Sequence, residues 1–454
     1  MKEGAHWGTM GSPMHTSWGI EPVPDRLRVL GPVDTLLLWT NLGISLLVLV
    51  LPGFFDLSLG KALLATVVGG VIGNLLLAVA GAIGADGRVP GMVLQRAPLG
   101  YRGSYIATVL NVLQCFGWAI FELIVIAKAA GLLCDKLFGF EATWFWTVLF
   151  GALTTALALL GPIGFVRRYV RKLAIWAVAA SLAYLTWWIL DGAGGHDVWS
   201  GKGHHGSFWA AVDIVIAVTV SWAPLVADYT RFSRDRRSAF FGVGVGYFLP
   251  TLFQFGFGSL LVLSRGLDPN HPELILVAIA GGGAAAALAL LALTVDETDE
   301  AFANTYSAAV SLQNLFPAVP QRLLILLSAA VATGGALWID LRSYQAFLLL
   351  LGSFFVPLLG VLIADWLLSG LRYTPDRFFA APAFRPAQIA AWLAGFALYQ
   401  WLYPNGPSWW LDLIHHHTAP YDISASIPSF AAAFGLAAIA GVLARRPRAA
   451  LAES

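Results

Sequence analysis

The chain has 454 residues, of which 58% are hydrophobic and 12% charged, with a formal net charge of +1 and a mean hydropathy of +0.73. Soluble domains carry about 25% charged residues, so this composition argues against a soluble fold and favours a membrane protein. The near-zero net charge argues against a nucleic-acid partner, and two cysteines are too few for a disulfide framework.

Twelve segments are apolar and long enough to cross a bilayer, which takes about 20 helical residues. In chain order they are 33–51, 62–83, 104–133, 144–161, 173–190, 208–228, 239–263, 284–309, 322–339, 343–369, 387–402 and 426–444. We therefore expect an all-α polytopic membrane protein with twelve transmembrane helices. Residues 1–32, which lack the apolar run of a signal peptide, and residues 445–454 are expected to be terminal tails.

The loops between these segments alternate in basic charge. Most of the 27 lysine and arginine residues fall in one alternate set of loops. The other set carries only Lys61, Lys136, Lys202, Arg265 and Arg342, and Lys128 lies inside the third segment. Cytoplasmic loops collect Lys and Arg while translocated loops do not. The alternation therefore predicts a multi-pass protein of the cell membrane with both termini in the cytoplasm.

The eighth segment carries a cluster of carboxylates within LLALTVDETDEAFANTYSAAVSLQNLF, namely Asp296, Glu297, Asp299 and Glu300. One interpretation is a solvated helix end at the membrane surface. The apolar run before the cluster and the position in the eighth segment favour a place within the membrane. There a polar stripe must face protein or water, because ionised groups facing lipid are costly, and intramembrane carboxylates indicate substrate or ion handling.

Two other segments contain residues that interrupt a helix in mid-membrane. In SWAPLVADYTRF, Pro224 cannot donate a backbone hydrogen bond and frees carbonyls around Ser221. In WTNLGISLLVLV, Asn41, Gly43 and Ser45 weaken the helix. Each feature alone could be a tolerated kink, but they occupy corresponding positions, the first and sixth segments, of two five-helix halves. Such paired interruptions indicate the binding site of a transporter built from inverted repeats.

The third segment places Gln114, Trp118 and Glu122 four residues apart, so the three side chains share one face of a helix. Trp118 alone could be packing against lipid or the core. A carboxylate such as Glu122 in the middle of a membrane helix is costly and indicates a function. A flat ring one turn from a carboxylate suits a flat heterocycle that carries hydrogen-bond donors.

Several stretches resemble the nucleobase:cation symporter-1 family, which includes permeases for cytosine, purines, allantoin, hydantoins and thiamine precursors. They are GRVPGMVLQRAPLGYRGS (87–104), LNVLQCFGWAIFE (110–122), SWAPLVADYTRF (221–232), NTYSAAVSLQNL (304–315) and IDLRSYQAFLLLLGSFFVPLLGVLIADWLL (339–368). Within the family, DETDEAFANTYSAAVSLQN and SIPSF look most like the hydroxymethylpyrimidine, or thiamine-precursor, permeases. The resemblance implies a LeuT-type 5+5 inverted repeat, residues 33–190 and 208–369, with two additional helices over 387–444.

The resemblance also implies a substrate site between the first, third, sixth and eighth helices. The third-helix Trp that stacks on the substrate corresponds to Trp118, and an amide four residues later is replaced here by Glu122. On the eighth helix the substrate-contacting Asn corresponds to Asn304, and Glu300 stands one turn earlier. The complete expected set is Asn41, Ser45, Gln114, Trp118, Glu122, Ser221, Trp222, Glu300 and Asn304. Trp222 does not align with the sixth-helix Trp of the hydantoin transporter.

The family's sodium site uses two adjacent hydroxyl residues and backbone carbonyls of the first and eighth helices. These positions correspond to Thr298 and Asp299, with Val295 as a carbonyl ligand, so a carboxylate replaces one hydroxyl. The resemblance implies a coupling ion and no other cofactor. That ion is either Na⁺, held by these oxygens, or H⁺, carried by a carboxylate, because carboxylates so close together do not all stay ionised in a low-dielectric site.

Glu122 and Glu300 can only accept hydrogen bonds when ionised, whereas an amide also donates. They favour a donor-rich ligand such as a hydroxymethyl-aminopyrimidine or cytosine over uracil or hydantoin, and they would also attract the cation thiamine. We expect a monomeric symporter, and no enzyme, that imports such a heterocycle by alternating access. A cytosine/purine or thiamine permease of the same family, a membrane enzyme and a channel are the alternatives. The run His415, His416 and His417 is the strongest argument for an enzyme, but we expect it in a solvated loop.

Overall fold

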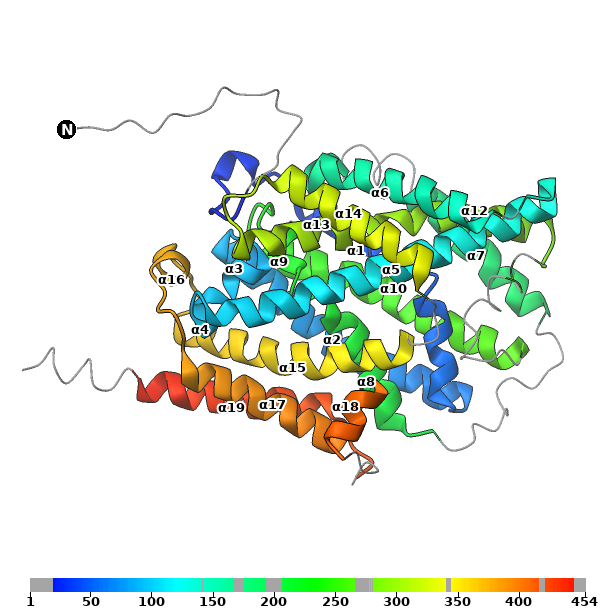
Figure 1. Ribbon diagram of the computed structural model, residues 1–454. Coiled ribbons are helices and arrows are strands. Elements are labelled where there is room, and N and C mark those ends of the chain that lie inside the picture. The colour runs from blue at the N-terminus through cyan, green and yellow to red at the C-terminus, as the bar shows by residue number, and fades with distance from the viewer. Residues whose placement is uncertain are drawn as a thin grey trace, which may run out of the picture.

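The computed structural model describes residues 19–140, 142–165, 175–192, 206–265, 277, 279, 281–339, 344–415 and 421–444. Nearly all of this part of the chain is helix and connecting loop (Figure 1). An isolated bridge joins Leu30 to Ser233. Both tail ends (1–18 and 445–454), the basic residues of 167–172, and Lys202, Arg342, His416 and His417 lie outside the described residues.

The first half contains η1 (Asp25–Leu27), α1 (Pro32–Asn41), η2 (Val48–Phe55), α2 (Leu59–Gly87), α3 (Gly91–Leu94), α4 (Arg96–Leu99), α5 (Gly103–Phe138), α6 (Thr143–Phe165) and α7 (Ile175–Gly192). The second half contains α8 (Phe208–Ser221), α9 (Val226–Thr230), α10 (Arg236–Arg265), α12 (Ala284–Asp296), α13 (Thr298–Leu315), α14 (Gln321–Trp338) and α15 (Tyr344–Leu368). The chain continues with α16 (Asp376–Phe379), α17 (Pro386–Leu402), α18 (Ser408–Leu413) and α19 (Ser426–Leu443).

Each expected membrane segment coincides with one of these helices or with a pair of them. In the described part of the chain, seven helices are long and apolar enough to cross a membrane. They lie in α2, α5, α6, α10, α14, α15 and α19. The first, sixth and eighth expected segments are each divided into two shorter helices, and none of these helices is among the seven.

The two interruptions that the sequence predicts are present. α1 ends at Asn41 and helical structure resumes only at Val48, after the stretch that contains Gly43 and Ser45. α8 ends at Ser221, and a turn leads past Pro224 into α9. A smaller irregularity was not expected: Glu297 separates α12, which ends at Asp296, from α13, which begins at Thr298. Glu297 keeps right-handed helical dihedrals (φ −51°, ψ −20°) and its backbone N–H donates to the backbone oxygen of Leu293, so the chain continues almost as one helix.

Helices from the two halves pack against one another in pairs. α2 packs on α10, α5 on α13 and α6 on α14, while α1 packs on α10 and α8 on α2. α15, α17 and α19 lie together along one side of the bundle (Figure 1). This packing surrounds the interrupted segments with helices, as irregular backbone at membrane depth requires.

The close approach of α3 to the interruption after α8 depends on a glycine. A Cβ atom added to Gly91 would lie 1.8 Å from the carbonyl oxygen of Pro224. The backbone N–H of Gly91 also donates to Asp228 Oδ1 of α9 at 2.9 Å. The short helix α3 thus fixes both sides of the turn between α8 and α9.

Candidate functional site

A small cavity lies where α5, α8, α10 and α13 meet, beside the turn between α8 and α9. Seven of the nine expected substrate residues line it: Gln114, Trp118, Glu122, Ser221, Trp222, Glu300 and Asn304. Val48, Val218, Leu225 and Tyr247 complete its wall. Its volume is about 10 Å³, measured as space open to the centre of a water-sized sphere, which is room for about one water molecule. A heterocycle can enter only after these side chains move apart.

One wall of the cavity comes from α5, whose expected polar face is buried. Gln114 and Glu122 are 0% exposed and Trp118 is 6% exposed. The amide nitrogen of Gln114 donates to the backbone oxygen of Ser221 at 2.7 Å and to Asn111 Oδ1 at 3.2 Å. The Ser221 carbonyl is one of those that the interruption at Pro224 was predicted to free. Gln114 Oε1 has no hydrogen-bond partner among the described residues.

The opposite wall comes from α13, and it meets α5 through a carboxylate–amide contact. Asn304 Nδ2 donates to Glu122 Oε1 at 2.9 Å and to the backbone oxygen of Glu300 at 3.2 Å. Within the described part of the chain, Glu122 Oε2 is buried without a hydrogen-bond partner. Both hydrogens of the Asn304 amide are therefore used within the protein, and the free atoms of this wall are acceptors.

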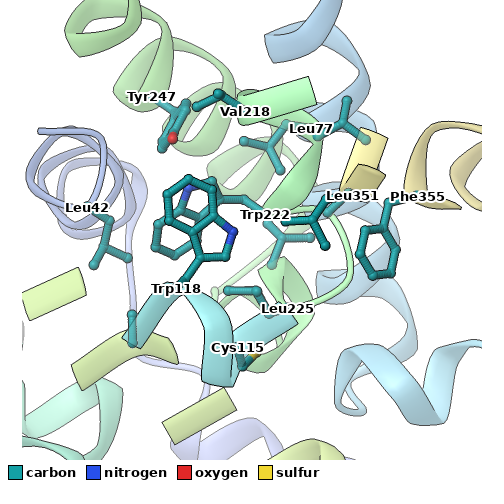
Figure 2. Packing of buried hydrophobic residues seen from close by; sticks show 14 of the residues in the cluster. Leu42, Leu77, Cys115, Trp118, Val218, Trp222, Leu225, Tyr247, Leu351 and Phe355 are labelled. Carbon is teal, nitrogen blue, oxygen red and sulfur yellow. The ribbon is translucent and has the colours of Figure 1, made fainter. Parts of the chain in front are cut away.

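Aromatic rings close the cavity on a third side. Figure 2 shows Trp118, Trp222 and Tyr247 beside Val218 and Leu225. The ring centroids of Trp222 and Tyr247 are 5.9 Å apart with a 58° angle between the planes. Sequence reasoning did not find Tyr247, because nothing in the local sequence distinguishes it from the other aromatic residues of α10.

The remaining two expected substrate residues, Asn41 and Ser45, do not line this cavity. Asn41 Nδ2 donates to Asp296 Oδ1 at 3.2 Å and also to Asp299 Oδ2. Ser45 Oγ donates to Glu297 Oε1 at 2.7 Å, and the backbone N–H of the next residue, Leu46, donates to Glu297 Oε2 at 2.7 Å. Both residues thus join the unwound stretch after α1 to the carboxylate cluster.

These contacts give a structural place to Asp296 and Glu297, two carboxylates that are not among the expected substrate or ion ligands. An interrupted helix leaves backbone groups without intrahelical partners, and Glu297 accepts from the N–H of Leu46 in the unwound stretch between α1 and η2. The carboxylate cluster therefore divides by direction. Asp296, Glu297 and Asp299 face the stretch after α1, whereas Glu300 faces the cavity.

The expected ion ligands lie at the junction of α12 and α13. Thr298 and Asp299 are 0% exposed. Thr298 Oγ1 and Asp299 Oδ1 have no hydrogen-bond partner in the described part of the chain. Val295, expected to contribute its carbonyl, is 38% exposed at the end of α12. Thr298 and Asp299 thus each keep one buried oxygen without a donor, and such an oxygen is chemically suited to a small hard cation or to a proton.

Comparison with known proteins is consistent with this geometry. The profile of the family described as permease for cytosine/purines, uracil, thiamine, allantoin matches residues 22–400. The chain is 28% identical to the cytosine permease of Escherichia coli K12 over 315 residues, which are 67% of this chain and 70% of the permease. It is 25% identical to the hydantoin permease of Microbacterium maritypicum over 369 residues, 76% of this chain and 74% of that protein.

Solved structures show the same fold at low identity. Mhp1, a nucleobase-cation-symport-1 family transporter in a closed conformation with bromovinylhydantoin bound, superposes with a TM-score of 0.75 at 19% identity, covering 96% of each chain. A Na⁺-coupled sialic acid symporter gives 0.63 at 10% identity, covering 95% of this chain and 92% of that one. The LeuT-type fold is therefore confirmed. The chain belongs to the nucleobase:cation symporter-1 family of membrane permeases.

Proposed function

We propose that this permease imports an aminopyrimidine-type heterocycle, such as a hydroxymethyl-aminopyrimidine, by symport with Na⁺ or H⁺. The observation that carries the proposal is the set of acceptor atoms around the small cavity. Gln114 and Asn304 use their amide hydrogens within the protein, and Glu122 keeps one carboxylate oxygen without a donor. A ligand that enters must supply hydrogens, or these buried acceptors stay unpaired at a cost.

The donor pattern of the substrate follows from these acceptors. An aminopyrimidine offers exocyclic N–H groups and, when protonated or tautomerised, a ring N–H as well. Uracil and hydantoin offer ring N–H groups but also present two carbonyl oxygens, which would meet the oxygens of Glu122 and Glu300. Trp118 would stack on the ring, with Trp222 and Tyr247 enclosing it from α8 and α10.

The transport cycle that we propose uses two five-helix repeats, residues 33–190 and 208–369, within a monomer of twelve membrane spans whose termini are cytoplasmic. The small volume of the cavity supports alternating access, because a ring-sized substrate needs the surrounding helices to separate. Thr298 and Asp299, with the Val295 carbonyl, would hold the coupling ion. Asn41 and Ser45, which we expected at the substrate, would instead connect the unwound stretch after α1 to that ion site.

A thermal-shift panel on the purified protein tests this proposal, because a bound ligand raises apparent stability by mass action. The panel contains a hydroxymethyl-aminopyrimidine, cytosine, adenine, uracil, hydantoin and thiamine, each with NaCl or choline chloride and at two pH values. We expect the aminopyrimidine to raise the melting temperature and uracil and hydantoin to leave it unchanged. A shift by uracil or hydantoin alone would refute the acceptor-lined site.

Cytosine permease is the second candidate function, and the likeness to the Escherichia coli cytosine permease favours it. Cytosine also carries an exocyclic amino group, so the same acceptors suit it. Titrating each compound separately in the same assay separates the two candidates. If cytosine raises the melting temperature at lower concentration than the hydroxymethyl compound, cytosine is the tighter ligand.

A further inference from the structure

A second cavity, of about 550 Å³ on the same measure, lies at one end of the helix bundle. It is formed by the end of α2, the start of α10, the segment before α1 and the residues between α15 and α16. Among the lining residues described for each, it has none in common with the small cavity. Figure 1 shows α16 and α9, which flank these segments in the sequence, at the same end of the bundle.

The charged residues of this cavity are mostly basic. Its lining contains the arginines Arg28, Arg88, Arg234, Arg236 and Arg372 and the aspartates Asp86 and Asp235. We call it the basic cavity. Its chemistry depends on which of these charges are already paired within the protein.

Both aspartates direct their oxygens toward protein donors. Asp86 Oδ1 accepts from Arg236, and Asp86 Oδ2 accepts from Trp366 Nε1 at 3.0 Å and from the backbone N–H of Tyr373 at 2.8 Å. Asp235 Oδ1 accepts from the backbone N–H of Ser238 at 2.8 Å, which holds the pKa of Asp235 below its usual value. The oxygens of both carboxylates are thus engaged by donors of the protein, and the five arginines of the lining outnumber the two aspartates.

Two more arginines have partners within the protein. Arg28 Nε donates to the backbone oxygen of Ser233 at 3.0 Å, and an Arg28 terminal nitrogen donates to that of Ala85 at 3.1 Å. Arg88 pairs with Asp25 at 3.0 Å. These contacts connect the segment before α1 to α2 and to the loop before α10. They hold this part of the cavity wall in place.

Arg234 and Arg372 remain. Both are exposed, and neither side chain has a hydrogen bond or ion pair with another described residue. We propose that the basic cavity binds a phosphate group, with the guanidinium groups of Arg234 and Arg372 as its direct contacts. A guanidinium presents a planar fork of donors that matches two phosphate oxygens, and it is weakly hydrated, so it gives up water readily.

The position of the cavity indicates where such a phosphate comes from. The apolar span Leu59–Gly87 ends at the lining of the cavity, and the apolar span Arg236–Ser264 begins there. The cavity therefore lies at the level of a membrane–water interface. Basic pockets between helices at that level bind the headgroups of anionic lipids. A phosphate compound dissolved in the adjacent water has the same chemistry. In either case the bound group would bridge the start of α10 and the residues before α16.

The test uses the full chain in nanodiscs and reads thermal stability in two arms. In phosphatidylcholine nanodiscs, inorganic phosphate is titrated against chloride at equal ionic strength. In the second arm phosphate is omitted and phosphatidylglycerol replaces part of the phosphatidylcholine. The variants are Arg234→Gln/Arg372→Gln and the control Arg237→Gln, which removes an exposed neighbouring arginine that does not line the cavity.

We expect the wild type and Arg237→Gln to be stabilised in at least one arm and the double variant to lose that stabilisation. A charge-assisted contact contributes enough that loss of one arginine should weaken phosphate binding about tenfold or more. Response in the first arm identifies a soluble phosphate, and response only in the second identifies a lipid headgroup.

Two results would overturn the proposal: no stabilisation of the wild type in either arm, or equal stabilisation of the double variant. If the double variant does not fold, the single variant Arg372→Gln decides, because this exposed side chain has no contact that folding needs. The test is independent of the transported heterocycle, which is left out of both arms.

Discussion

At the scale of single residues, the chemistry of the small cavity follows from its two amide side chains, whose N–H groups already donate to acceptors within the protein. The nitrogen of Gln114 faces a backbone oxygen and the nitrogen of Asn304 faces a carboxylate, so the orientation of both amides is fixed by their partners. Gln114 Oε1 and Glu122 Oε2 are left for a ligand. An amide can donate or accept a hydrogen bond. Because the protein uses the N–H groups of both amides, the site selects ligands that donate.

Replacing Glu122 by Gln tests this selectivity. The amide can still accept from Asn304, but its new N–H group meets the hydrogens of the substrate, and a charge-assisted bond is lost. We expect affinity for an aminopyrimidine to fall about tenfold to a hundredfold, measured by titration in the thermal-shift assay. The control is Asp376→Asn, which removes an exposed carboxylate of α16. Unchanged affinity in Glu122→Gln would remove Glu122 from the site.

Replacing Trp118 by Ala tests the stacking surface. Trp118 is 6% exposed and lines the cavity, whereas Trp338, at the end of α14, is 89% exposed. Loss of a stacked ring should abolish most uptake by Trp118→Ala in proteoliposomes, while Trp338→Ala transports normally. Both proteins should reconstitute to equal density. Full transport by Trp118→Ala would contradict the stacking role.

At the scale of helices, the interruptions are the features that place the site. Gly43 with Asn41 predicted the end of α1, and Pro224 predicted the end of α8, because these residues act on their own backbone. The irregularity at Glu297 was missed. Glu297 contacts Ser45 and Leu46, more than 250 positions away in the sequence, and no local pattern reveals such partners.

The contrast between local signals and long-range contacts also explains which parts of the candidate site the sequence predicted. The spacing of Gln114, Trp118 and Glu122 put them on one helix face, and the structure brings all three to one cavity. Asn41 and Ser45 were assigned to the substrate because they lie at an interruption. Which neighbour an unwound stretch faces depends on how α1 packs beside α12 and α13, and that arrangement is not encoded locally.

Gly91 provides a test at this scale. Its missing side chain lets α3 approach Pro224, where a Cβ would be 1.8 Å from the carbonyl oxygen. Gly91→Ala must displace the turn between α8 and α9, so we expect lower thermal stability and loss of most uptake. Gly60→Ala, on α2, meets no atom within 4 Å and should be neutral or stabilising by up to about 1 kcal/mol. Equal behaviour of the two variants would contradict the role of this contact.

At the scale of the whole molecule, the interrupted helices connect the small cavity to the carboxylate cluster. The small cavity contacts the turn after α8, and the carboxylates beside it hold the stretch after α1. Substrate and ion would therefore act on the same moving parts. Coupling of this kind is reciprocal: each ligand raises the affinity of the other by the same factor.

Asp299→Asn tests the coupling. Asn41 can still donate to the new amide oxygen, so the fold should persist, but the charge that balances a cation or carries a proton is gone. We expect substrate binding to survive and its dependence on Na⁺ or pH to disappear, measured as the substrate dissociation constant with and without the ion. Unchanged ion dependence would exclude Asp299 from coupling.

The contacts between the stretch after α1 and the α12–α13 junction also constrain how the sequence can change. Ser45 and the amide of Leu46 both rely on Glu297, and Asn41 relies on Asp296 and Asp299. A chimera that exchanges residues 284–315 for those of a relative without these carboxylates would leave an N–H group and two side chains buried without acceptors. Residues 41–46 and 296–299 must therefore be transplanted together, as one interchangeable unit.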